Sequence, residues 1–239
     1  MKRGRWCVTK LIFIFLVLIV SFIIYNVYTS YGAPFDKVMP KASGGGSTVS
    51  RNELDNLYIL VSEADNLLQK SLVTVLKMVA NKDEIEEIAR RLKEIENIKE
   101  PKEYRSAMDT VVSDAQSVIE RAMEKQKTQE KIQALDAQQK QLLGNTIFNI
   151  FLAGLKDKAA VEKAQQLSQA IQSNPASGAS LAADLDKIRT IITTLPPQID
   201  KTFKIGNNLA KLAQANKIEA AIPKSSSEKA KDANLPGSG

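Results

Sequence analysis

The residues that most often carry out chemistry are scarce in this chain, because it has no histidine and a single cysteine, Cys7. Histidine is the commonest general base and a leading metal ligand, and a Ser–His–Asp arrangement is impossible without it. Without cysteine beyond residue 7, the usual ligands of zinc and copper and the thiol nucleophile are also missing. We therefore expect no enzymatic activity, no catalytic residues, no metal site and no cofactor.

Clustered carboxylates remain as candidates, since acidic residues can bind calcium or cleave glycosides. One cluster and the bases that follow it are Asp83, Glu84, Glu86 and Glu87, then Arg90, Arg91 and Lys93. A second pair, Asp184 and Asp186, has Lys187 and Arg189 nearby. Acids are favoured in a first helical turn and pair with bases three or four residues on, so we interpret both clusters as solvated helix faces.

The basic charge of the chain is concentrated at its beginning. The formal net charge is +6, and four basic residues precede the first apolar run: Lys2, Arg3, Arg5 and Lys10. Taking these four from the 33 basic residues leaves 29 against 27 acidic ones, so the rest of the chain is nearly neutral. A nucleic-acid partner is therefore not expected. The chain has no phosphate-loop or dinucleotide motif and no other motif specific to a known family.

An apolar run at residues 11–28 follows this basic segment of residues 1–10. As a helix it rises about 27 Å, close to the thickness of a bilayer core. Tyr25, Tyr28 and Tyr31 cluster at its far end, where aromatic rings favour the interface. By the positive-inside rule, residues 1–10 are cytoplasmic, residues 11–31 form a single transmembrane anchor, and the remainder lies outside the cytoplasm. The absence of a glycosylation sequon suits a bacterial periplasm.

A cleaved signal peptide is the alternative interpretation of residues 11–31. Small residues near a suitable cut occur at Ser30–Gly32, although the apolar run is longer than the usual signal core of about 7–15 residues. Both interpretations place the body of the protein across the inner membrane.

The rest of the chain predicts an all-α fold, with a linker, a bundle and a tail. Residues 32–49 contain two prolines and three consecutive glycines, which is typical of a flexible linker. Residues 50–220 predict an antiparallel bundle of five or six amphipathic helices, and residues 221–239 predict a disordered tail. One apolar stripe runs at helical spacing through Leu54, Leu57, Val61, Ala64, Leu68, Leu72, Val75 and Val79.

Local signals predict where helices begin and end. Ser50 with Glu53 and Asn81 with Glu84 have the spacing that caps a helix start. Residues 144–146 predict a turn, and Pro196–Pro197 predict an interruption. The polar stretch 124–141 is either a projecting arm or the solvated face of a bundle helix.

Residues 142–155 are the least polar stretch beyond the anchor, and they are too short to span a bilayer. They are either the main core of the bundle or an exposed tip that contacts a membrane or a partner. The residues that would form this candidate interaction surface are Ile147, Phe148, Phe151 and Leu155.

The leading functional hypothesis is a membrane-anchored scaffold or protein-interaction module of the cell envelope, with other envelope proteins as partners. The first alternative is a soluble periplasmic binder or chaperone of apolar ligands, released by signal cleavage. The second is a membrane-active protein that inserts residues 142–155. Nothing in the sequence indicates an oligomeric state.

Overall fold

A computed structural model describes residues 49–173 and 182–233 of the chain. In these ranges there are six helices and no strand: α2 (Arg51–Val79), α3 (Lys82–Ile95), α4 (Pro101–Glu124), α5 (Gln126–Gln133), α6 (Ala137–Ser173) and α8 (Ala182–Ala215). The all-α prediction is therefore confirmed for this part of the chain. The predicted anchor at residues 11–31 and most of the linker lie outside the described residues. Within them, no helix is both long and apolar enough to cross a membrane.

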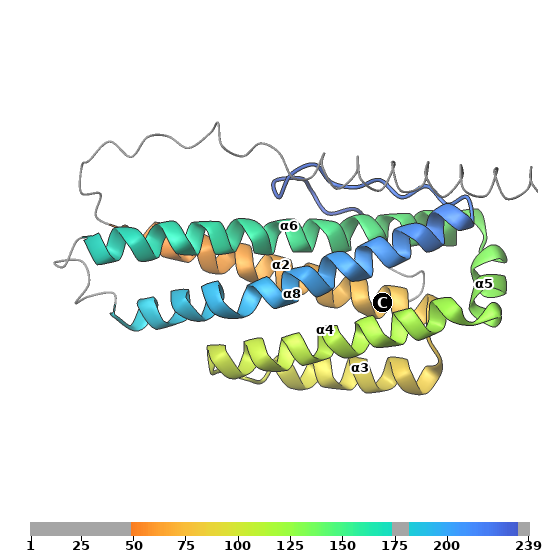
Figure 1. Cartoon of the computed structure of the whole chain (residues 1–239), viewed down its shortest axis with the longest axis horizontal. Helices are drawn as coiled ribbons and strands as arrows, with labels where there is room; N and C mark the ends of the chain where they lie inside the picture. Colours follow the sequence, from red (N-terminus) through yellow and green to blue (C-terminus); the bar gives the residue numbers. More distant parts are fainter. Residues whose placement is uncertain (1–48, 174–181, 234–239) are drawn as a thin grey trace, which may run out of the picture. The chain divides into compact units, whose positions relative to one another are not determined.

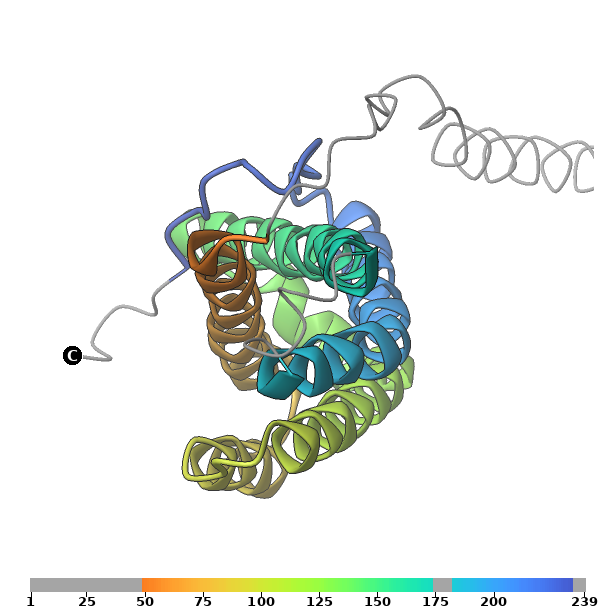
Figure 2. The same cartoon turned by 90° about the vertical axis from the view of Figure 1, so that its left-hand side faces the viewer.

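Helix directions differ from a purely antiparallel bundle. The helices α2, α6 and α8 pack side by side, and α6 runs opposite to the other two (Figures 1 and 2). Helix α4 runs parallel to α8, as two contacts in step show: Lys201 pairs with Asp109, and further along Asn208 donates to Glu120. The parallel pairing is possible because the long helix α6 returns the chain between them.

The predicted caps form at the first two helix starts. Ser50 accepts from the backbone N–H of Glu53, whose side chain accepts from the N–H of Ser50. Asn81 and Glu84 form the same reciprocal pair at the start of α3. A third pair, absent from the sequence prediction, joins Asp136 and Gln139 before α6. These pairs satisfy backbone donors that a helix start leaves without partners.

The polar stretch 124–141 does not project from the bundle as an arm. It contains the short helix α5, whose Thr128 and Ile132 are buried against the bundle, and a turn into α6. The interpretation as a solvated face with a narrow buried edge fits α5. However, α5 covers only Gln126–Gln133, so the stretch 124–141 is not one continuous bundle helix.

The predicted turn at residues 144–146 is wrong, because α6 is continuous from Ala137 to Ser173. A Cβ atom on Gly144 would lie 2.2 Å from the backbone oxygen of Glu219, which crosses α6 at this point. The glycine therefore permits a close approach of two backbones.

The predicted interruption at Pro196–Pro197 is also wrong, since both prolines lie inside α8. Both rings are exposed, while Leu195 and Gln198 on either side of them are buried. Each proline leaves the carbonyl four residues earlier, at Ile192 or Thr193, without its helical N–H partner. Neither residue is buried, so water can replace that partner. Packing of the inner face holds the helix together across the two prolines.

Helices α6 and α8 are joined by a reciprocal contact of phenylalanine rings with glycines. The ring of Phe151 lies against Gly206, and the ring of Phe203 lies against Gly154. The two ring centroids are 6.2 Å apart, within the range of favourable aromatic pairs. The same Phe-x-x-Gly spacing occurs on both helices, and the small residues make room for the rings.

The apolar core consists of two clusters. The cluster that we call the three-helix region is formed by α2, α6 and α8 alone: Leu54, Leu57, Val61, Ala160, Ala164, Leu167, Ile171, Ile188, Ile191 and Leu195. The cluster that we call the wide region runs from Leu68 to Val79 on α2. It adds side chains of α3, α4, α5 and the other ends of α6 and α8. All eight residues of the predicted α2 stripe are buried.

The C-terminal residues differ from the predicted disordered tail. In the structure, residues 218–233 leave α8 and extend along the bundle (dark blue in Figure 1). Ile218 and Pro223 are buried, and Ala220 and Ala233 pack against the wide region. Residues 234–239 lie outside the described residues. Side chains of α2 and α6 hold the described part of the tail by hydrogen bonds to its backbone.

Candidate functional site

The predicted interaction surface lies mostly inside the bundle. Ile147, Phe148 and Phe151 are buried, and Leu155 is partly buried. Ile147 and Phe151 belong to the wide region of the core. Among the described residues, the only large hydrophobic side chains that are exposed are Ile59 and Ile222. The structure therefore places residues 142–155 in the core and does not present them as an exposed tip.

A layer of buried polar side chains separates the two core regions. On α2, Asp65 lies between Val61 of the three-helix region and Leu68 of the wide region. On α6, Asp157 lies between Ala153 and Ala160 in the same way. Gln198 and Thr202 occupy this level on α8, and α4 contributes Arg105 from near its beginning. We call the set Asp65, Arg105, Asp157 and Gln198 the polar layer.

Arg105 and Asp65 form the charged pair of the layer. The guanidinium donates from Nη1 to Asp65 Oδ1 at 2.8 Å and from Nη2 to Asp65 Oδ2. Tyr104 donates to Asp65 Oδ2 at 3.3 Å, and its own hydroxyl accepts from Gln69 at 3.2 Å. Both charged side chains are almost fully buried, so the pair gains a strong attraction and bears a large desolvation cost. Burial, followed by the charge of Asp65, raises the pKa of the Tyr104 hydroxyl.

Asp157 is less completely satisfied. Gln198 donates from Nε2 to Asp157 Oδ2 at 3.3 Å, while Asp157 Oδ1 and Gln198 Oε1 have no hydrogen-bond partner among the described residues. Burial and then the nearby charge of Asp65 raise the pKa of Asp157 well above its ordinary value, and Arg105 only partly opposes them. The layer can therefore hold a proton on Asp157 at a pH where an exposed aspartate has lost it.

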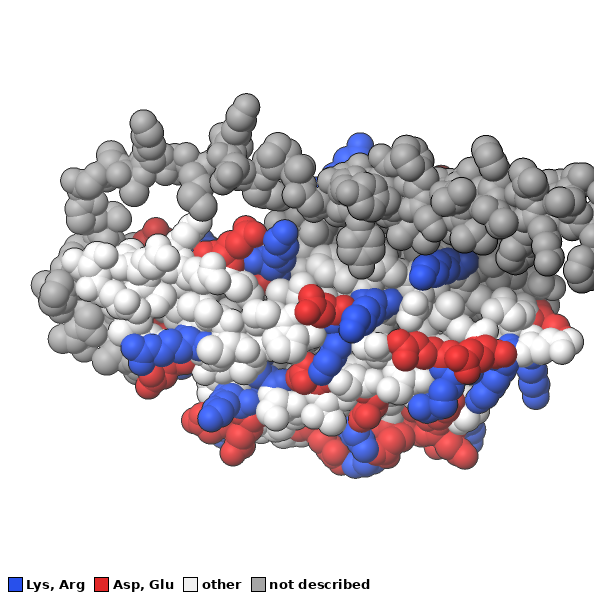
Figure 3. Space-filling model, viewed as in Figure 1, with Lys and Arg blue, Asp and Glu red and all other residues white. Residues whose placement is uncertain are grey.

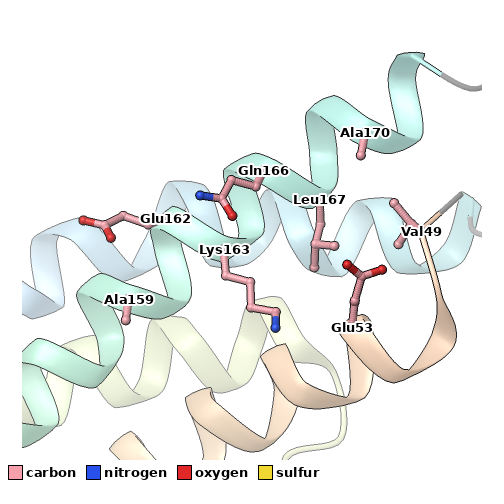
Figure 4. Close-up of a pocket in the computed structure, with 8 residues that line it drawn as sticks. All are labelled: Val49, Glu53, Ala159, Glu162, Lys163, Gln166, Leu167 and Ala170. Atoms are coloured by element: carbon pink, nitrogen blue, oxygen red, sulfur yellow. The ribbon is translucent and has the colours of Figure 1, made fainter. Parts of the chain in front are cut away.

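A surface groove of about 390 Å³ lies on the three-helix region, at the end away from the polar layer. It runs between the start of α2, where Val49 and Glu53 lie, and the second half of α6 (Figure 4). Lys163 extends from α6 toward the first turn of α2, where the Glu53 carboxylate already accepts from Ser50. Hydrogen bonds from Ser50, and to a smaller extent the charge of Lys163, lower the pKa of Glu53. Its lining is half charged or polar, with Glu53, Glu162, Lys163 and Gln166, and half apolar.

The two acidic clusters singled out in the sequence behave differently. Glu87 pairs with Arg90 and Arg91 on the exposed face of α3, as the interpretation of a solvated face requires. Asp184 is buried instead. It accepts from Arg51 at 2.8 Å and from the Tyr58 hydroxyl at 3.2 Å, so it joins α8 to α2. Burial and Asp184 raise the pKa of Tyr58 to about 12.

The polar layer was missed by sequence reasoning, although its signal is present. Asp65 and Asp157 follow buried residues at helical spacing, which places each carboxylate on the inner face of its helix. Such a position favours a buried partner or a raised pKa. In the described ranges, no group of three or more His, Cys, Asp or Glu side chains is placed to hold a metal ion.

Charges of both signs are mixed on the face of the bundle seen in Figure 3, and a largely uncharged area covers part of α6 and α8. Comparison with protein-family models, with curated proteins and with solved structures finds no match to this chain.

Proposed function

We propose that the protein is a non-enzymatic interaction module of the bacterial envelope. It is anchored in the inner membrane by residues 11–28, with its bundle on the periplasmic side. The observation that carries the proposal is the succession of a basic start, an apolar run of spanning length and a neutral domain at residues 50–220. A linker of this length reaches about 20–25 Å, so the bundle can contact partners close to the bilayer.

The internal packing of the bundle supports this proposal over the two alternatives. Insertion of residues 142–155 into a membrane would require Ile147, Phe148 and Phe151 to leave the core. A binder of apolar ligands would need an apolar hollow, whereas half of the residues that line the groove beside α2 are charged or polar. A domain that satisfies its own apolar faces is suited to making contacts through its surface.

Cell fractionation and protease accessibility test the anchoring. We expect the full chain in the inner-membrane fraction, resistant to alkaline carbonate, with the bundle digested in spheroplasts but not in intact cells. A variant lacking residues 1–33 should remain in the cytoplasm. A matched variant that carries a cleavable signal peptide in place of residues 1–33 should be exported but not anchored.

Intact-mass measurement and crosslinking in cells complete the test. A mass lower by about 32 residues would favour the released binder, since cleavage removes the predicted signal peptide. Crosslinks from bundle lysines to other envelope proteins should disappear in the exported but unanchored variant. Retention of these crosslinks in that variant, or recovery of the intact chain from the cytosol, would contradict the proposal.

A further inference from the structure

The C-terminal tail is held by its backbone. After α8, Lys217 adopts a left-handed conformation, and the N–H groups of Lys217 and Ile218 bond back to the carbonyls of Gln214 and Ala213. This cap turns the chain out of the helix axis. Residues 218–233, which we call the strap, then cross α6 and run along the bundle (Figure 1).

Asn149 on α6 forms the central contact with the strap. Its side chain donates from Nδ2 to the Lys231 carbonyl at 2.8 Å and accepts from the Lys231 N–H at 2.8 Å. Two residues of neighbouring antiparallel strands exchange the same pair of bonds. With the strap in place, Asn149 is only 3% exposed. The side chain thus pairs with an extended backbone as a neighbouring strand would.

Two further side chains continue this pattern along the strap. Asn145 donates to the Asp232 carbonyl at 2.7 Å, and Thr74 of α2 donates to the Ala233 carbonyl at 3.3 Å. Three successive strap residues therefore give backbone atoms to α6 and α2. Contacts of this kind bind an extended segment with little regard to its side chains.

One contact selects a side chain. The Lys231 ammonium lies 4.4 Å from the centre of the Phe148 ring, in the range of a cation–π interaction. Phe148 is 3% exposed with the strap in place. The site therefore favours a segment that places a basic residue over Phe148. In the strap, small residues such as Ala230 and Ala233 lie close to this basic residue in the sequence.

The strap is held in a way that permits exchange. From Lys224 to Asp232 none of its residues is buried, so its attachment here depends on hydrogen bonds and on the contact of Lys231 with Phe148. Each hydrogen bond contributes only modestly to stability, because the same groups bond to water when the strap is released. A tethered segment is nevertheless favoured by an effective concentration of order millimolar. A competing segment must reach that concentration or make additional contacts.

We propose that Thr74, Asn145, Phe148 and Asn149 form a binding site for an extended peptide, which the chain's own residues 231–233 occupy. When the strap leaves, the site takes an extended segment of a partner protein that carries a Lys or Arg over Phe148. This inference deepens the proposed function, because it gives the interaction module a specific docking site and a resident competitor.

Exchange of the strap can be measured on the full-length chain purified in mild detergent. The probe is a synthetic peptide with the sequence of residues 226–239, added in excess, and the readout is hydrogen exchange at the Lys231 amide. That amide is protected by Asn149 in the resting protein. Peptide at about ten times its Kd should raise exchange of the Lys231 amide roughly tenfold, because it captures the site whenever the strap opens. If exchange of the Lys231 amide is not accelerated at the highest soluble concentration of the peptide, the proposal is overturned.

Matched variants separate this site from general loosening of the bundle. Asn149→Leu removes both bonds to Lys231 and should abolish protection of that amide and binding of a labelled peptide. Asn207→Ala, at an exposed asparagine on α8, should change neither. Retention of protection in Asn149→Leu would overturn the proposal.

Peptide variants test the site even if Asn149→Leu fails to fold. A peptide with Lys231→Glu should bind the wild-type chain at least fivefold more weakly, since its carboxylate would face the ring and lose a cation–π contact worth about 1 kcal/mol or more. Equal affinity of the two peptides would overturn the predicted preference for a basic residue. These measurements do not depend on the cellular compartment, so they can fail without contradicting the anchoring proposal, and the reverse is also true.

Discussion

The two regions of the core are built from the same helices but differ in how they are enclosed. In the three-helix region, α2, α6 and α8 enclose the apolar side chains alone. In the wide region, α3, α4, α5 and the strap are added around the other ends of these helices. The polar layer lies at the boundary, near the point where α4 begins.

This difference shows how one long helix can serve two environments. Helix α6 contributes Phe151 to the wide region, Asp157 to the layer and Leu167 to the three-helix region. A buried, hydrogen-bonded charge pair at the boundary restricts sliding of the helices, because any shift in register would leave a charge without its partner. We therefore expect the helices to keep a single register across the boundary. We also expect the two regions to differ in stability, because they are enclosed by different numbers of helices.

The largest effect is expected from breaking the charged pair. Arg105→Met leaves Asp65 buried without its guanidinium and should cost about 3–5 kcal/mol of unfolding free energy, measured by urea denaturation. The double variant Asp65→Leu with Arg105→Met removes both charges and should recover most of the loss. If Arg105→Met lowers the unfolding free energy by less than the double variant does, the charged pair does not stabilise the boundary between the two regions.

Matched leucine truncations compare the regions directly. Leu143 in the wide region and Leu195 in the three-helix region are both fully buried. Leu143→Ala should cost about 3–5 kcal/mol, and Leu195→Ala about 2–3 kcal/mol, because a cavity enclosed by fewer elements can collapse more completely. Urea denaturation gives the two values, and hydrogen exchange should be faster in the three-helix region of the wild type. Equal costs would remove the distinction in stability.

The boundary should make stability depend on pH. The pKa of Asp157 is raised by folding, so above the ordinary carboxyl pKa of about 4 the folded chain binds more protons than the unfolded chain. The free energy of unfolding should therefore be greatest at low pH for this group and fall as pH rises toward the folded-state pKa, by about 1.4 kcal/mol per pH unit.

Asp157→Asn tests this dependence, because its neutral amide has no proton to lose and offers an N–H to the Gln198 oxygen. The contribution of Asp157 to the slope should disappear, and at neutral pH the variant should be more stable than the wild type by about 1–3 kcal/mol. Asp200→Asn, at an exposed position on α8, is the control and should leave the slope unchanged. An unchanged slope in Asp157→Asn would exclude Asp157 as its source.

The smallest effect is expected at the end of the wide region, where the strap begins. Lys217 has a φ of 56°, which costs a residue with a side chain about 1–2 kcal/mol. Lys217→Gly should stabilise the protein by about 0.5–1 kcal/mol, after the greater entropy of glycine in the unfolded chain is subtracted. Thermal denaturation measures this gain in stability. Lys211→Gly, inside α8, should instead destabilise by about 1 kcal/mol.

Much of the helical architecture was predictable, because it depends on local features. The reciprocal caps at Ser50 and Asn81 join residues three positions apart, and successive residues of the α2 stripe are three or four positions apart. The errors at Gly144 and Pro196–Pro197 arose where a distant contact decides the outcome. Gly144 accommodates the backbone of Glu219, and the inner face of α8 is packed on both sides of its prolines.

The candidate site was less predictable than the fold. The placement of Asp65 and Asp157 on inner helix faces was present as a pattern, but their meeting with Arg105 depends on which helices become neighbours. Asn145 and Asn149 carry no signal of their own, since their partners lie more than 80 residues further along the chain. Their role follows only from the path of the strap.

The sequence alone determined the helical class, the starts of α2 and α3 and the buried α2 stripe, because these follow from spacing and short-range hydrogen bonding. It also determined the absence of histidine and of any cysteine beyond Cys7, which limits the available chemistry. Only the tertiary structure decided that Phe148 lies inside, that α4 runs parallel to α8, and that Asn149 binds the backbone of Lys231. Those outcomes depend on contacts between segments far apart in the chain, whose geometry exists only once the bundle has formed.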